Sequence, residues 1–123
     1  MNTYEGCLLR LGTIDKCGRK FAEDCKITFP EKVPVTYNFQ SGVDKVLGFA
    51  EISKDDNGLK CKVTMEHNNF TGPEYYIGGY YNGIKKHIES GINVIDECRL
   101  VSMSIVPDSE CCDEEMKIWK MEG

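Results

Sequence analysis

The side chains in this 123-residue chain that could do chemistry are few, and they do not form a metal motif. The two histidines, His67 and His87, are not in register with any cysteine pair, and the seven cysteines contain no CxxC spacing. A structural zinc site needs such spacings, so the sequence predicts none. The carboxylates of Asp55-Asp56 and of residues 113–115 lack the spacing of an EF-hand loop, and we expect them in a turn and a solvated tail. The sequence therefore predicts no metal and no cofactor.

The cysteines are numerous, and their odd number excludes a fully paired disulfide framework. Cys111 and Cys112 form a vicinal pair in an acidic segment. The others lie mostly in apolar or turn contexts, where cysteine usually acts as a small buried apolar side chain. That group is Cys7, Cys17, Cys25, Cys61 and Cys98.

The elements that must position these residues are short β-strands. Leu59, Cys61, Val63 and Met65 alternate with polar residues, which is typical of a half-buried strand, and the preceding segment 55–58 ends in the hairpin signal Asn-Gly, which favours a type I′ turn. The predicted strands span 4–14, 19–28, 33–39, 45–53, 58–66, 74–84, 92–97 and 99–106. We predict mostly strand over 75–85, a short helical turn over 85–90, and either a helical turn or a final edge strand over 113–121.

Eight short strands with little helix predict a mainly β fold, a small antiparallel barrel or sandwich. The chain has no linker or repeat, and its length suits one domain over 1–123. The C-terminal segment from about residue 108 is expected to dock, because Ile118 and Trp119 are apolar.

A series of segments resembles the prohead (capsid-maturation) proteases of tailed phages. In order along the chain these are the strand 8–14 with its turn 15–18, Val33 to Asn38, Val46 to Ala50, Asp55 to Leu59, and the closing strand Leu100 to Asp108. Roughly two-thirds of the chain takes part, and the order of the segments is more specific than any one of them. The resemblance implies a β-barrel core and a phage setting.

The resemblance also implies where catalytic residues would lie, and they are missing. The position of the catalytic histidine is occupied by Phe39, which cannot accept a proton. The segment matched to the nucleophilic serine, 76–80, has glycine in the serine's place, and the acidic position holds Leu100, with Glu97 three residues earlier. A serine protease needs a nucleophile, a base and a group that orients the base. We therefore expect a non-enzymatic protein.

The alternative is an active capsid-maturation serine protease with a rearranged site, in which His67 and Ser102, or Ser104, would form a dyad. From the residues alone, His67 is a solvated loop residue and the two serines are ordinary strand residues. His87, beside Lys85-Lys86, is expected on a solvated face.

Four tyrosines within seven residues form the remaining candidate site: Tyr75, Tyr76, Tyr80 and Tyr81. Tyrosine is enriched at protein interfaces because it buries a large area and keeps a polar group. On a strand, Tyr76 and Tyr80 share one face while Tyr75 and Tyr81 share the other. We expect one pair in the core and the other exposed for a binding partner.

Charge and hydropathy narrow the partners. The net charge of −5, with Lys85-Lys86 as the one basic doublet, gives no support for nucleic-acid binding. No apolar run approaches the ~20 residues that a membrane span requires, and the N-terminus lacks the features of a signal peptide. We expect action in the host cytoplasm during assembly, with the virion as a further location. The expected partners are phage capsid or other virion proteins, in a decoration or assembly role, and copies of the chain itself. A small host-interaction or inhibitor protein is a further alternative.

Overall fold

The computed structural model describes residues 2–40, 45–66 and 70–121. It is mainly β, as predicted, and beside the strands these ranges contain a short 3₁₀ turn, Asp108–Glu110. Within these ranges no helix is long and apolar enough to cross a membrane. The strands are β1 (Asn2–Arg10), β2 (Arg19–Thr28), β3 (Lys32–Tyr37), β4 (Gly48–Asp55), β5 (Gly58–Met65), β6 (Glu74–Glu89), β7 (Ile92–Ile105) and β8 (Lys117–Lys120).

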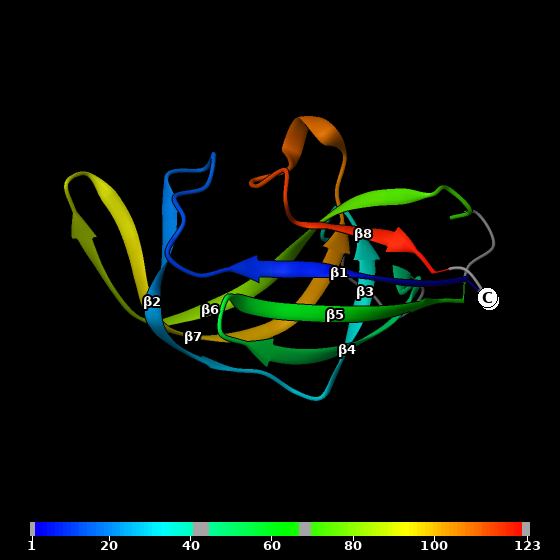
Figure 1. The fold of residues 1–123 in the computed structure, drawn as a ribbon, viewed down its shortest axis with the longest axis horizontal. Coiled ribbons are helices and arrows are strands. Elements are labelled where there is room, and N and C mark those ends of the chain that lie inside the picture. The colour runs from blue at the N-terminus through cyan, green and yellow to red at the C-terminus, as the bar shows by residue number, and fades with distance from the viewer. Residues whose placement is uncertain (1, 41–44, 67–69, 122–123) are drawn as a thin grey trace.

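The strands close into a barrel. Neighbouring strands follow the order β7-β3-β4-β5-β1-β8-β6, and β6 pairs again with β7, which makes a ring of seven strands (Figure 1). β2 extends the sheet beyond this ring by pairing with β7. Of the two predicted architectures, barrel and sandwich, the structure is the barrel. A closed ring removes the free sheet edges that promote aggregation.

The prediction of a purely antiparallel sheet is wrong at β7. β7 pairs in parallel with β2, through Arg19↔Asn93 to Thr28↔Arg99, and with β3, through Val35↔Met103 to Tyr37↔Ile105. One long edge of β7 therefore carries two strands in succession, while its other edge carries β6. The predicted break between strands 92–97 and 99–106 is also wrong, since Cys98 continues the ladder opposite Gly83.

The barrel interior is filled by one side of each strand, as alternation of apolar and polar residues requires. On β5, Leu59, Cys61, Val63 and Met65 are buried, which confirms the predicted alternation. The largest fully buried side chains come from nearly every strand of the ring. They are Tyr4, Leu8, Val33, Val35, Leu59, Val63, Met65, Ile77, Leu100, Met103, Ile105 and Ile118.

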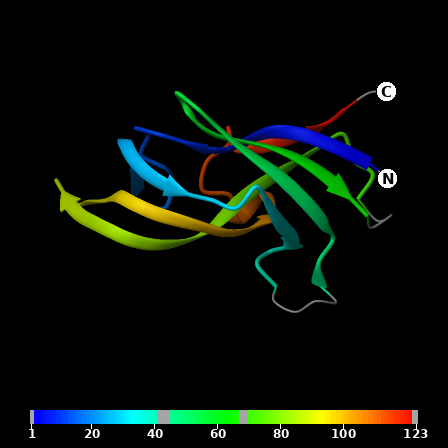
Figure 2. The same cartoon turned by 90° about the horizontal axis from the view of Figure 1, so that it is seen from below.

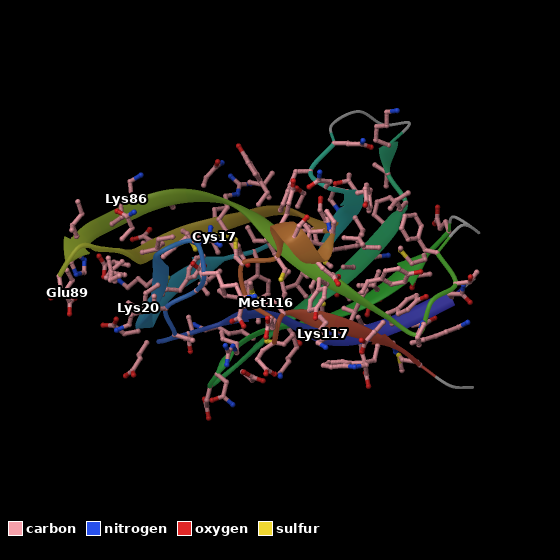
Figure 3. All side chains as sticks on the ribbon, turned by 90° about the horizontal axis from the view of Figure 1, so that it is seen from above. Cys17, Lys20, Lys86, Glu89, Met116 and Lys117 are labelled. Carbon is pink, nitrogen blue, oxygen red and sulfur yellow. A yellow bond between two sulfur atoms is a disulfide. The ribbon has the colours of Figure 1, made fainter. Side chains whose placement is uncertain are left out.

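The second half of β6 and the first half of β7 form a hairpin arm that projects from the barrel (Figures 1 and 2). The predicted helical turn over 85–90 is wrong, because β6 continues to Glu89. Ser90 and Gly91 connect the two strands with φ values of 51° and 79°, and two consecutive positive φ angles are typical of a type I′ turn. Figure 3 places Lys86 and Glu89 near the free end of this arm.

The predicted hairpin between β4 and β5 is present, but its turn differs from the predicted type. Asp55 Oδ1 accepts hydrogen bonds from the backbone N–H groups of Asn57 (2.8 Å) and Gly58 (3.0 Å). Asn57 does not have the positive φ that a type I′ turn requires. The turn is thus organised by the aspartate side chain.

One cysteine prediction is wrong. Cys17 is bonded to Cys112 in a disulfide that joins segments 95 residues apart, so Cys17 is not a small buried apolar side chain. The prediction is confirmed for the cysteines that lie buried in the core cluster as free thiols, which are Cys25, Cys61 and Cys98.

The segment after β7 is held against the β1–β2 connection, and we call this contact the clasp. Besides the disulfide, Arg10 donates two hydrogen bonds of 2.8 Å to the carboxylate of Asp113, and Lys16 pairs with Glu114 at 2.7 Å. Asp113 is buried, which corrects the expectation of a wholly solvated acidic tail. The clasp positions β8, which is a strand but not an edge, because it lies between β1 and β6 (Figure 3).

Candidate protein-binding face

The two backbone positions after β3 turn the chain back over the barrel wall. Asn38 and Phe39 adopt left-handed conformations, with φ values of 48° and 59°. The Phe39 N–H donates to Ser104 Oγ at 2.9 Å, and the Phe39 ring lies over Gly78, where an added Cβ would be 3.2 Å from Cζ. The resemblance places the catalytic histidine at Phe39 and the nucleophilic serine in segment 76–80. In the structure, Phe39 thus lies directly above Gly78 of that segment. Neither phenylalanine nor glycine can transfer a proton.

Ser104 is fully buried, and the fold uses its hydroxyl. Its Oγ lies 2.6 Å from Thr36 Oγ1, in addition to the bond from the Phe39 backbone. Both hydroxyls sit between β3 and β7, where Thr36 is the Cα partner of Ser104. Among the described residues the partners of this hydroxyl are Thr36 and the Phe39 backbone, which gives Ser104 a structural role.

The rearranged dyad receives no support from the described residues. Ser102 is half-buried on β7 opposite Tyr80, and His67 lies outside the described residues. His87 is the Cα partner of Val94, eight residues along β7 from Ser102, which is roughly 26 Å at about 3.3 Å per residue. His87 therefore does not serve Ser102.

His87 instead belongs to an ionic cluster on the hairpin arm. Its Nδ1 lies 2.5 Å from Asp96 and its Nε2 lies 3.1 Å from Glu89. Hydrogen bonds to Asp96 and then to Glu89 raise the pKa of His87 above its usual value, because both carboxylates favour the imidazolium. The expected solvated position is confirmed, since the side chain is exposed.

The acidic position of the resemblance and the free thiols offer no substitute chemistry. Leu100 is fully buried in the core, and Glu97 pairs with Lys85 at 3.8 Å. Burial raises the pKa of the Cys61 and Cys98 thiols to about 12, so neither is a thiolate at neutral pH. No cluster of His, Cys, Asp and Glu that could hold a metal ion occurs in the described part of the chain.

The four tyrosines divide between the two faces of β6. Tyr75 packs against the core, with its ring 5.6 Å from that of Tyr4, and Tyr81 packs against Phe21 at 5.0 Å. On the opposite face, Tyr80 is 52% exposed, and Tyr76 is half-buried with Lys117 Nζ 5.1 Å above its ring. The expected division is present only in part: Tyr76 and Tyr80 lie on the outward side, but Tyr80 alone is exposed, and Tyr76 is half-buried like Tyr75 and Tyr81.

Tyr81 is the most constrained of the four. Its ring folds back over Gly79, where an added Cβ would lie 2.5 Å from the tyrosine oxygen. Burial raises the pKa of Tyr81, and its Oη is buried without a hydrogen-bond partner among the described residues. Tyr81 is therefore a partly buried residue that packs against the core.

Tyr80 belongs to a larger exposed surface, which we call the aromatic face: Pro34, Phe39, Phe49, Tyr80 and Ser102. Phe49 pairs with Pro34, and Tyr80 pairs with Ser102. The parallel register pairs Val35 on β3 with Met103 on β7, so Pro34 lies beside Ser102, one residue earlier on each strand. A row of side chains therefore crosses four strands, in the order Phe49, Pro34, Ser102 and Tyr80. Phe39 is 44% exposed and Phe49 is 40% exposed. None of these five residues is charged, and the exposed pair Lys32 and Glu51 lies two residues further along β3 and β4 on the same side of the sheet.

Sequence reasoning identified Tyr80 but missed Phe49. The alternation on β4 could have identified it: Ala50 and Ile52 are buried, so Phe49, one residue before Ala50, points to the opposite side of the strand. A large aromatic side chain on the outer side of a strand is a candidate contact residue when it joins a contiguous apolar patch.

Comparisons with protein-family models, with curated proteins and with solved structures gave no match. The geometry of the aromatic face is therefore the basis for any functional assignment.

Proposed function

We propose that this protein is a non-enzymatic, phage-encoded structural or accessory protein that binds capsid or other virion proteins through its aromatic face. The observation that carries the proposal is the exposed group Phe39, Phe49 and Tyr80. Phe39 stands where the resemblance to prohead proteases assigns a catalytic histidine. Exposed aromatic side chains next to small residues are typical of the centre of a protein interface. The phage setting rests on the resemblance alone.

The partner, in this proposal, presents an apolar surface to the face, since the face has no charges with which to recognise an ionic one. Pro34 and Ser102 lie between Phe49 and Tyr80 in this row, so a partner that contacts the aromatic side chains also contacts these two smaller residues. The same surface allows association between copies of the chain. The protein then acts in the host cytoplasm during assembly, with the virion as a further location.

The test is co-sedimentation of the purified protein with assembled capsids of the same phage. The double variant Phe49→Ser/Tyr80→Ser is expected to weaken binding more than about tenfold, because two central aromatic residues are removed. The control is Ile88→Ser, which removes an apolar residue that is 74% exposed on the hairpin arm, away from the face. Absence of capsid association, or equal binding by the double variant, contradicts the proposal.

The active-protease alternative is tested on the same material. Incubation with the capsid or scaffold precursor is expected to leave it intact. Cleavage that disappears in Ser102→Ala would show an enzyme and overturn the proposal.

A further inference from the structure

A groove of about 740 Å³ lies on the opposite wall of the barrel from the aromatic face. It follows the outer side of β5, β1 and β8, whereas the aromatic face lies on β4, β3, β7 and β6. Ligand-binding pockets typically have volumes of roughly 300–1,000 Å³. The groove is therefore large enough for a small ligand or a segment of a polymer.

The groove exists because β8 is shorter than β1. β8 pairs with Tyr4, Glu5 and Gly6, while β1 continues to Arg10 along β5. Beyond Gly6 the segment leading into β8 leaves the side of β1, and Glu115 from that segment forms the far wall. The clasp holds this wall in place.

The charged side chains that line the groove are two carboxylates, Glu5 and Glu115, and two cations, Arg10 and Lys60. Arg10 is bonded to Asp113 in the clasp and Lys60 Nζ lies 3.9 Å from Asp55, so both cations already face a carboxylate outside the groove. The groove therefore lacks the excess positive charge that nucleic acids or phosphates require, and its two carboxylates supply hydrogen-bond acceptors. Asn57, at the β4–β5 turn, adds an amide with both donors and acceptors.

Trp119 forms an aromatic wall at one end of this polar groove. It is 46% exposed and is the cross-strand partner of Glu5 on β1. Its indole thus lies beside a carboxylate acceptor. A flat apolar ring beside donors and acceptors of both kinds matches a ligand that has an apolar face and many hydroxyl groups.

We propose that the groove binds a neutral carbohydrate, with one sugar ring stacked on Trp119 and its hydroxyl groups hydrogen-bonded by Glu5, Lys60 and Asn57. Sugar hydroxyls donate and accept, so they satisfy both the carboxylates and the cations of the lining. An anionic ligand would be repelled by Glu5 and Glu115, because the two cations of the lining are already paired with Asp113 and Asp55. This site is separate from the aromatic face and does not depend on the function proposed for it.

The chain contains one tryptophan, so its fluorescence reports on the groove directly. The protein is titrated with a panel of neutral oligosaccharides, namely hexamers of glucose, mannose and N-acetylglucosamine, and binding is measured in parallel by calorimetry. At least one hexamer is expected to shift the emission and to protect Trp119 from acrylamide quenching. No response to any member of the panel, in fluorescence and in calorimetry, overturns the proposal.

Variants locate the site. Trp119→Ala and Glu5→Gln are each expected to weaken the calorimetric affinity about tenfold or more, since each removes one principal contact. Tyr80→Ser, on the aromatic face, is expected to leave carbohydrate affinity unchanged. Unchanged carbohydrate affinity in both Trp119→Ala and Glu5→Gln would contradict the assignment. The assignment is also contradicted if an extended peptide, and none of the sugars, changes the fluorescence of Trp119. Capsid co-sedimentation of Trp119→Ala stays normal if the two sites are independent.

Discussion

Breaking the Cys17–Cys112 disulfide should lower the free energy of unfolding by an amount that the chain separation sets. The bond closes a loop of 95 residues. In the loop-entropy model the cross-link removes about 15.7 cal/mol/K from the unfolded chain, which corresponds to about 4.7 kcal/mol at 25 °C. Measured values usually fall between about 2 and 4 kcal/mol, because unfolded chains keep residual structure. We expect a loss of about 2–4.7 kcal/mol.

The assay is equilibrium unfolding in urea, followed by the emission of Trp119, with and without a thiol-free reductant. For a slope of about 2 kcal/mol/M, the midpoint should fall by about 1–2.4 M on reduction. Cys17→Ser should show the lower midpoint in both conditions, because it has no bond to reduce. Lys16→Ala is the matched control, since it removes the neighbouring exposed ion pair and keeps the disulfide.

The reasoning is refuted if the oxidised protein, with the bond verified by mass spectrometry, unfolds at the same urea concentration as the reduced protein. It is equally refuted if purified protein carries no such bond after exposure to a disulfide oxidant. A reductant effect that persists in Cys17→Ser would assign the stabilisation to another cysteine pair.

Three further predictions concern single side chains. Thr36→Val should cost about 1–3 kcal/mol in urea unfolding, because Ser104 loses its buried hydroxyl partner. Gly79→Ala should cost about 1–3 kcal/mol in the same assay, as the added methyl would overlap Tyr81, and unchanged stability would show that the ring moves aside freely. His87 stabilises the arm when it is charged. Since the pKa of His87 in the folded protein is raised above its ordinary value of about 6.5, this stabilisation is complete below pH 6.5 and disappears as pH rises through the folded pKa. His87→Gln should therefore differ from wild type most in acid, and an imidazole titration by NMR with an unshifted midpoint would refute the cluster.

Local alternation in the sequence predicted the strands whose outer and inner sides differ strongly in polarity. β5 is the clearest case, since Lys60 and Lys62 separate buried apolar residues. β2 was predicted over its observed range of Arg19–Thr28. Period-2 patterns succeed here because burial of one side of the sheet determines the register.

Within the hairpin arm, only the end of β6 was mispredicted, because the pattern there resembles a helical turn. Ile84 and Ile88 are four residues apart, which is the spacing of a helical face. In the structure they are exposed on β6, and the strand is held by its ladder with β7 and by the turn at Ser90-Gly91. Tertiary pairing overrides a weak local pattern in such a segment.

The long-range features could not be predicted from one sequence. The parallel ladders of β7 and the Cys17–Cys112 bond join segments distant along the chain, and no local propensity encodes them. The aromatic face has the same origin, because its residues come from separate strands. The alternation of side chains along β6 left open which tyrosine pair would face outward. Ile77 shares a side of the strand with Tyr75 and Tyr81, and because Ile77 is buried in the core, Tyr76 and Tyr80 face outward.

Because Phe39 packs on Gly78, replacing one of these residues by a catalytic side chain would not create a catalytic site. A side chain at Gly78 would meet the Phe39 ring at 3.2 Å, so the glycine and the aromatic ring depend on each other. A histidine in place of Phe39 would still lie near Ser104, whose hydroxyl is already bonded to Thr36 and to the backbone. Leu100 is fully buried among apolar side chains, and a carboxylate there would pay a large desolvation cost. Proton transfer at this wall would require at least three coordinated replacements, whereas the present residues already form an exposed, uncharged surface suited to binding.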